Sequence, residues 1–155
     1  MSQERRSMDR IVVGIDGSEG SAAALRWAAQ LAAACGAEVV VVHVIDPSTY
    51  DLRSLGLPRA ALNEGDWREE IQYELEARWC GPLVEAGVRH RARVEDGRAG
   101  ARLVEIAEWE HADLLVTGHR GLSGLGELVH GSVGAYVTHH ATCPVAIVPA
   151  EPRAA

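Results

Sequence analysis

Residues 10–45 place a helical segment between two apolar runs, and this alternation constrains the fold more than any other feature. The runs Arg10–Asp16 and Ala37–Ile45 are short and rich in β-branched residues, which is typical of strands buried on both faces of a sheet. Between them, Ser21–Cys35 has the pattern of a helix, with Ser18 as a candidate cap and Gly36 as its stop. A strand, a helix and a second strand in this order predict a parallel sheet.

The remainder of the chain continues the same pattern. Val88–Val94 alternates arginines with mostly apolar residues, which predicts a half-exposed edge strand whose arginines form a solvated face rather than a basic patch. Right-handed crossovers then give a doubly wound, single-domain α/β fold, with five parallel strands in the order 3-2-1-4-5 and helices on both faces. The other predicted elements are helices at Asp66–Val84 (interrupted near Gly81-Pro82), Ala99–His111 and Glu127–His140, and strands at Ala112–Thr117 and Pro144–Val148.

One connection is unusually long. Asp46–Gly65 has no clear periodicity and contains Pro47, Gly56 and Pro58. Its length of about twenty residues exceeds the roughly 12–15 residues of ordinary loops. Two interpretations stay open, a flap near a ligand and a mobile insertion.

A glycine-rich segment follows the strand predicted at 112–117. It begins with Gly118-His119-Arg120-Gly121 and, after nine further residues, reaches Gly131-Ser132-Val133. The N–H groups of such a loop, the N-terminal end of the next helix and the Ser132 hydroxyl are suited to phosphate oxygens. The segment is not a Walker A loop, which needs a lysine that this chain lacks, and its glycine spacing differs from a dinucleotide fingerprint. The sequence therefore predicts an anion site made of backbone, hydroxyl and arginine groups.

The topology would bring this segment close to an acidic turn. Asp16 ends the first predicted strand and Thr117-Gly118 ends the fourth. In a sheet of order 3-2-1-4-5 the winding reverses between these strands, and ligands bind outside their carboxyl ends. Two alternatives remain: Asp16 as a simple cap of the next helix, and Ser132 as an ordinary helix residue.

Taken together, these motifs resemble the ATP-binding branch of the universal stress protein family. The resemblance rests on the Gly-x2-Gly-x9-Gly-Ser spacing, on Ile11–Ser18 as first strand and acidic turn, on His43–Asp46 as the end of the second strand, and on Cys143–Pro149 as the last strand. It covers residues 8–149 as one domain, with 1–7 and 150–155 as flexible termini. It implies a Rossmann-like fold of the adenine nucleotide alpha hydrolase type.

The resemblance also implies an ATP site, with residues assigned by motif match. Asp16 would lie at the nucleotide and Val44 beside the adenine. A carboxylate beside a triphosphate needs an intervening cation, which implies Mg²⁺, or a neutral ribose or base group as its partner. The residues expected around the ribose and phosphates are Thr117, Gly118, Gly121, Gly131, Ser132 and Val133, with Arg120 as the fixed positive charge of the loop.

Composition narrows the function classes. A formal net charge of −7 argues against nonspecific binding to nucleic acids or anionic membranes, and no apolar run approaches a membrane span. Three cysteines without C-x-x-C spacing fit a reducing cytoplasm. The histidines and carboxylates show neither metal-ligand spacing nor a catalytic set, so no catalytic or metal-ligating residue is predicted.

The sequence leaves three candidate functions. The resemblance implies an ATP-binding universal stress protein that acts as a nucleotide-dependent sensor or regulator in the stress response. A slow ATP hydrolase or phosphoryl-transfer enzyme would use the same pocket, although the density of positive charge is low for fast transfer. A nucleotide-free dimeric interaction module is the third. Because Val145–Val148 is apolar and uncharged, an unpartnered last strand would favour edge pairing, unless the tail Glu151–Ala155 covers it. The family's usual arrangement implies a homodimer through this C-terminal strand.

Overall fold

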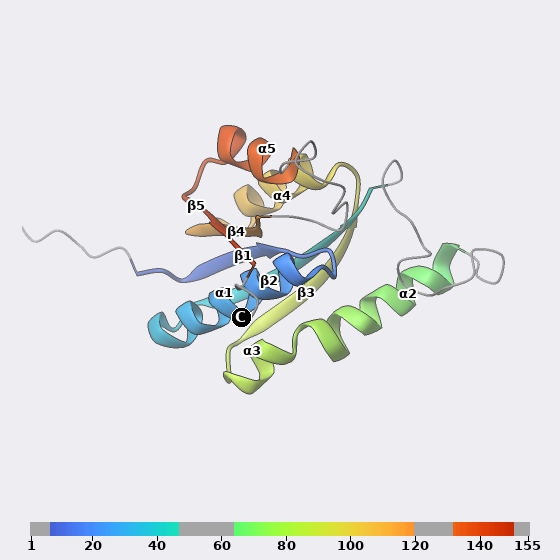
Figure 1. The fold of residues 1–155 in the computed structure, drawn as a ribbon, viewed down its shortest axis with the longest axis horizontal. Coiled ribbons are helices and arrows are strands. Elements are labelled where there is room, and N and C mark those ends of the chain that lie inside the picture. The colour runs from blue at the N-terminus through green and yellow to red at the C-terminus, as the bar shows by residue number, and fades with distance from the viewer. Residues whose placement is uncertain (1–6, 47–63, 120–131, 151–155) are drawn as a thin grey trace, which may run out of the picture.

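The computed structural model describes residues 7–46, 64–119 and 132–150 of the 155-residue chain, with only the backbone of 64–67 and 132 (Figure 1). Within these residues, five parallel strands form one sheet in the order β3-β2-β1-β4-β5, which confirms the predicted order. The central strand β1 pairs with both β2 and β4. The strands are β1 (Arg10–Gly14), β2 (Glu38–Ile45), β3 (His90–Asp96), β4 (Leu114–Gly118) and β5 (Val145–Val148).

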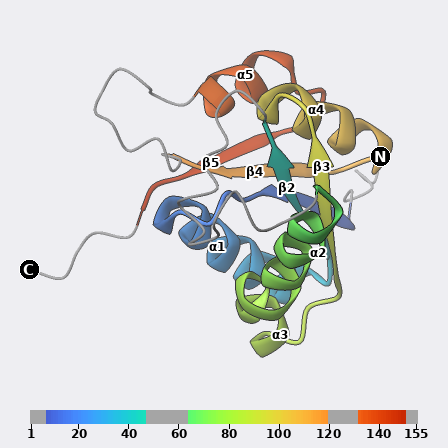
Figure 2. The same ribbon diagram turned by 90° about the vertical axis from the view of Figure 1, so that its right-hand side faces the viewer.

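Helices cover both faces of the sheet (Figure 2). Along β1, Ile11 and Val13 pack into the core cluster that contains α1 residues, whereas Val12 packs into the cluster that contains α4 residues. Both faces of β1 are therefore buried, which explains its continuous apolar sequence. The helices on one face are α1 (Glu19–Cys35), α2 (Glu64–Glu74) and α3 (Gly81–Glu85), and those on the other are α4 (Ala99–Trp109) and α5 (Ser132–His140).

Both predicted ends of the first helix are confirmed. The Ser21 N–H donates to Ser18 Oγ at 3.2 Å, so Ser18 caps α1, which begins at Glu19. Gly36 ends the helix in the left-handed region at a φ of 81°, and its N–H donates to the Ala32 carbonyl. These caps fix the start of α1 directly after β1.

The segment predicted as a helix over Asp66–Val84 is divided into three parts. A π-helical turn, η2 (Leu75–Trp79), lies between α2 and α3. The interruption falls where Gly81-Pro82 predicts it, because proline has no N–H and its ring excludes a carbonyl four residues earlier. The Cys80 N–H instead donates five residues back, to the Leu75 carbonyl at 3.0 Å.

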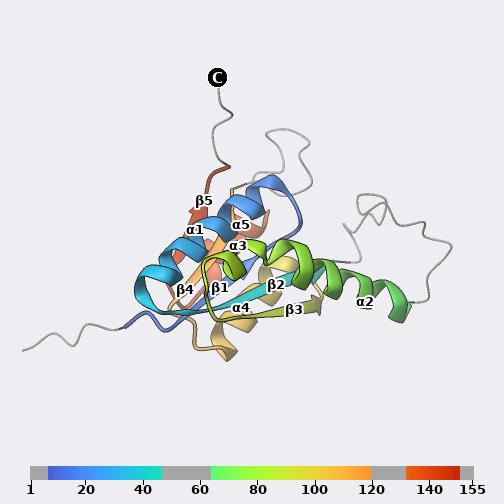
Figure 3. The same cartoon turned by 90° about the horizontal axis from the view of Figure 1, so that it is seen from below.

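The strand β3 forms one edge of the sheet, as its alternating sequence predicts, and α2 runs alongside it (Figure 3). Gln72 Nε2 donates to the Ala92 carbonyl at 3.3 Å, and the Arg68 guanidinium donates to the Val94 carbonyl at 3.0 Å. Side chains of α2 thus donate hydrogen bonds to backbone carbonyls of this edge strand, which discourages its pairing with another strand.

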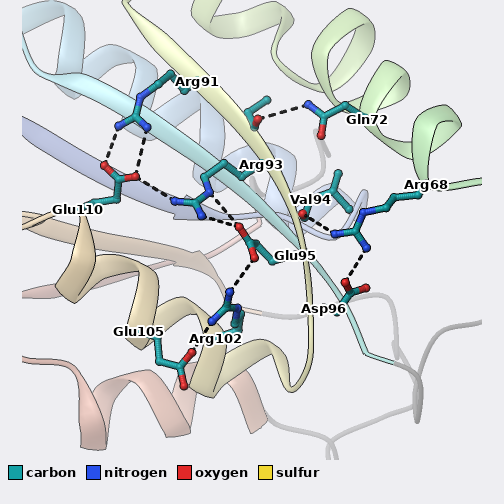
Figure 4. A network of polar contacts seen from close by, with 11 residues as sticks. Arg68, Gln72, Arg91, Arg93, Val94, Glu95, Asp96, Arg102, Glu105 and Glu110 are labelled. Carbon is teal, nitrogen blue, oxygen red and sulfur yellow. Dashed lines mark hydrogen bonds and ion pairs between the residues drawn. The ribbon is translucent and has the colours of Figure 1, made fainter. Parts of the chain in front are cut away.

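The arginines of β3 are bound to carboxylates (Figure 4). Arg91 donates two hydrogen bonds to the Glu110 carboxylate, at 2.7 and 3.2 Å, and Arg93 donates a third at 3.1 Å. Glu110 is buried, and the bonds from Arg91 hold the pKa of its carboxyl below the usual value. Arg89 and Arg91 are exposed and Arg93 is half-buried, which confirms the half-exposed arginine face. The sequence does not predict that Arg91 and Arg93 also belong to an ion-pair network that joins β3 to the end of α4.

Some other helix and strand boundaries differ by a few residues from those that the sequence predicts. β3 begins at His90 rather than at Val88, because the Val88 N–H donates to the Leu83 carbonyl and so belongs to the turn after α3. The helix predicted over Glu127–His140 is described from Ser132 onward. Residues 47–63 and 120–131 lie outside the described residues, so the two interpretations of the long connection are not tested.

Candidate functional site

The strands β1 and β4 end side by side at the point where the strand order reverses. Val13 lies opposite Val116 in their parallel pairing, and the chain continues from these positions to Asp16 and to Thr117-Gly118. These predicted site residues therefore come together at one edge of the sheet. Such a reversal point is where open α/β sheets bind their ligands.

Asp16 belongs to a turn that is tied to the start of α1. Its Oδ1 accepts the Ser18 N–H at 2.9 Å, and its own N–H donates to Ser21 Oγ at 3.3 Å. Ser21 Oγ in turn donates to the Ser18 carbonyl at 3.0 Å. Because Ser18 provides the helix cap, the alternative in which Asp16 is the cap is wrong. The half-buried carboxylate is held in place by its own turn.

Gly118 lies against the first turn of α1. A Cβ added to Gly118 would stand 2.7 Å from the carbonyl carbon and oxygen of Gly20 and 2.9 Å from the Ser21 nitrogen. Backbone atoms cannot move aside as the end of a flexible side chain can. The packing of β4 against α1 therefore requires glycine at this position, in addition to any role in the close approach of a ligand.

Thr117 brings a buried hydroxyl to the end of β4. The residue is 3% exposed, and its Oγ1 is buried with no partner in the part of the chain that the structure describes. Leu115, two residues earlier, packs in the core cluster on the α4 side, so alternation along the strand directs Thr117 to the same face. The valines Val44 and Val133, also predicted for the site, pack at the border of that cluster.

The structure does not place every predicted site residue. Val44 pairs with Glu95 near the end of β2, and Ser132 is the first residue of α5. Arg120, Gly121 and Gly131 fall outside the described residues, as does most of the glycine-rich segment. The described site therefore consists of the acidic turn, the ends of β2 and β4, and the start of α5.

Behind the acidic turn lies a pair of aromatic rings that sequence reasoning does not connect with the site. His43 is buried, its Nδ1 lies 2.9 Å from the Ile15 carbonyl oxygen, and burial lowers the pKa of its imidazole. His43 is therefore a histidine of the core. The Trp79 ring packs edge-on to the His43 ring at 5.3 Å between centroids. Trp79 also contacts Gly17, where an added Cβ would stand 2.8 Å from the indole.

Comparison with known proteins gives one consistent family. A family model described as the universal stress protein family matches residues 8–149. Universal stress protein MJ0531 of Methanocaldococcus jannaschii is 34% identical over 146 residues, which are 90% of this chain and 81% of that protein. Universal stress protein YxiE of Bacillus subtilis is 32% identical over 147 residues, which are 90% of this chain and 98% of that protein.

A solved structure extends the comparison to three dimensions. The crystal structure of a universal stress protein in complex with cAMP aligns with a TM-score of 0.69 at 28% identity, over 93% of this chain and 98% of that one. None of the helices in the described part of the chain combines the length and apolar character that crossing a membrane requires.

Proposed function

The chain belongs to the universal stress protein family, and on this basis we propose that it binds an adenine nucleotide and acts as a nucleotide-dependent sensor or regulator in the stress response. The proposed site lies outside the carboxyl ends of β1 and β4. Occupancy of the site would favour one conformation, or one set of partners, over another, because a ligand shifts a population toward the state that it binds better.

The observation that carries this proposal is the Thr117 hydroxyl. Burial of a hydroxyl without a hydrogen bond is unfavourable by about 1–3 kcal/mol, and Thr117 Oγ1 is such a group among the described residues. A ribose hydroxyl or a phosphate oxygen at this end of β4 would accept its proton in a hydrogen bond. A nucleotide thus gives a physical reason for threonine at a position where valine would fill the same volume.

Other groups at the site suit the same class of ligand. Val44 offers an apolar contact to adenine, and phosphates are expected at Arg120, Gly121 and Ser132 from the sequence motif. The cAMP of the similar structure is itself an adenine nucleotide, which supports the ligand class. ATP in particular is inferred from the glycine spacing.

Asp16 would meet the nucleotide in one of two ways. The carboxylate would face Mg²⁺ carried by the phosphates, or it would accept a hydrogen bond from a neutral group of the nucleoside. Its Oδ1 is already oriented by the Ser18 N–H at 2.9 Å. This orientation reduces the ordering that ligand binding would otherwise require.

We also propose a homodimer that forms through β5. The two edges of the sheet differ, because α2 side chains bond to carbonyls of β3, whereas β5 presents the uncharged run Val145–Val148 with Ile147 exposed. A strand edge without charged residues favours pairing with another strand. The free cysteines Cys35, Cys80 and Cys143 support a cytoplasmic location.

Titration of the nucleotide-free protein with ATP, AMP and cAMP, with and without Mg²⁺, tests the proposed function. Micromolar binding of at least one of them is expected. Failure of all three to bind to folded protein would overturn the proposal and favour the nucleotide-free interaction module. Hydrolysis of ATP that rises with Mg²⁺ and disappears in Asp16→Ala would instead establish the slow ATPase.

A further inference from the structure

We propose that Trp79 is a positioning residue for the acidic turn Asp16–Ser18, and that the π-helical turn η2 brings it there. The inference rests on the proposed function, since its consequence is a nucleotide site whose affinity depends on the position of α2 and α3. Trp79 itself need not touch the nucleotide. It would act through the turn that presents Asp16.

The π-helical turn changes which residues of this segment face the core. The buried positions are Ile71, Leu75, Cys80 and Leu83, so the step after Leu75 is five residues instead of the three or four of a regular α-helix. Trp79 stands at the regular spacing of four from Leu75. The extra residue of η2 displaces Trp79 from the buried row, and the indole is half-buried beside it.

The displaced indole contacts the acidic turn. A Cβ on Gly17 would stand 2.8 Å from Trp79 Cζ2 and 3.1 Å from Cη2, so the ring lies directly against the Gly17 backbone. Gly17 has a φ of 81°, and it lies between Asp16 and the cap Ser18. A substituted residue here would meet both backbone strain and the indole.

The same indole also contacts the buried histidine. The rings of Trp79 and His43 are edge-on at 5.3 Å between centroids, with 73° between their planes. His43 Nδ1 is 2.9 Å from the Ile15 carbonyl oxygen, directly before Asp16. Trp79 thus supports the turn at two points, through Gly17 and through the histidine that is bonded to Ile15.

These contacts predict reciprocal coupling. A nucleotide that fixes the turn at Asp16 also fixes the surface on which Trp79 packs. Conversely, a shift of α2 and α3 moves Trp79 and, through it, the turn. Coupling between two sites is equal in both directions. A protein that contacts α2 or α3 would therefore alter nucleotide affinity, and nucleotide would alter its binding.

The first test compares ATP affinities by calorimetry in the full chain. Trp79→Ala should weaken ATP binding by roughly fivefold or more, which is the lower end of ordinary coupling, whereas Trp79→Phe should retain most of the affinity because a ring still packs on Gly17. Trp27→Ala, at an exposed tryptophan of α1, is the matched control and should leave the affinity unchanged. Thermal unfolding of each variant identifies any loss that comes from an unfolded chain.

Two further readouts separate positioning from general stability. ATP should change the tryptophan emission of the wild type and of Trp27→Phe, and this change should be largely lost in Trp79→Phe. Gly17→Ala should weaken ATP binding less in the Trp79→Ala background than in the wild type, because the indole that its Cβ would meet is gone.

The outcomes distinguish this inference from the proposed function. If the wild type binds ATP, while Trp79→Ala binds it equally well and Gly17→Ala has the same effect in both backgrounds, the positioning role is overturned and the nucleotide site stands. If the folded wild type binds no adenine nucleotide, both proposals are overturned. Loss of affinity in Trp79→Ala with retention in Trp79→Phe supports both.

Discussion

Gly118 at the end of β4 and Gly20 in the first turn of α1 are in backbone contact, with the position of a Gly118 Cβ only 2.7 Å from the Gly20 carbonyl. This contact brings the glycine that opens the predicted anion-binding motif to the helix that follows the acidic turn. The two halves of the proposed site are thus joined by the packing of the chain itself, without a ligand between them.

Replacement of Gly118 by alanine should therefore destabilise the protein. Overpacking of this kind lowers the free energy of unfolding by about 1–3 kcal/mol, and urea unfolding measures it. Gly134→Ala in α5 is the matched control, since its Cβ would make only an ordinary contact at 3.6 Å from Ile147 Cδ1 and alanine favours a helix, so this variant should be no less stable than the wild type. Equal stability of both variants would show that the α1 backbone yields easily at this contact.

The sequence predicts the architecture well because its signals are local. The apolar runs of β1 and β2, the Ser18 cap and the Gly36 stop each depend on a few neighbouring residues, and all of them are found. The interruption near Gly81-Pro82 is likewise predicted from the chemistry of proline. Local rules do not predict that the interruption becomes a π-helical turn.

The site is less predictable because it depends on contacts between distant segments. Trp79 appears in the sequence as one more residue at regular helical spacing, and only the displacement at η2 brings it to Gly17. Gly118 is expected to serve a ligand, while its contact with Gly20 needs the packed structure. The pairing of Arg91 with Glu110 likewise joins residues of different elements.

The buried His43 makes stability dependent on pH. Burial lowers the pKa of this imidazole below the value of about 6.5 in an unfolded chain. The unfolded state therefore binds more protons as the pH falls below about 6.5, and stability decreases in that direction, by up to about 1.4 kcal/mol per pH unit. Urea unfolding at pH 7.5 and 5.5 should show a smaller loss for His43→Asn than for the wild type.

This experiment has an internal control. Asparagine retains a donor for the Ile15 carbonyl but does not titrate, so the difference between the two proteins isolates the protonation of His43. The carboxyls with lowered pKa, such as Glu110, lose their stabilising charge only at more acidic pH. An identical pH dependence in His43→Asn and the wild type would show that His43 does not titrate on unfolding.

The proposed dimer predicts the effect of a charge on β5. Ile147 is 36% exposed on this edge strand, and lysine at such a position opposes edge pairing. Sedimentation velocity should show a dimer for the wild type and a monomer for Ile147→Lys. Tyr73→Lys on α2, where the side chain is 65% exposed, should remain dimeric. A monomeric wild type would remove the dimer proposal.

Thr117→Val should have opposite effects on stability and on ligand affinity. The substitution removes a buried hydroxyl that has no partner among the described residues, so the free energy of unfolding should rise by about 1 kcal/mol. It also removes a donor to the nucleotide, so ATP affinity should fall by roughly three- to tenfold. Thr138→Val provides the control, because its exposed hydroxyl donates to the Gly134 carbonyl within its own helix.

The most direct test of the nucleotide site is calorimetric titration of nucleotide-free wild type and Thr117→Val with ATP and Mg²⁺, with urea unfolding of both proteins. The account predicts micromolar binding by the wild type, about −8 kcal/mol, and weaker binding by a variant that is more stable. Absence of binding by the folded wild type, or equal affinity of the two proteins, would contradict it.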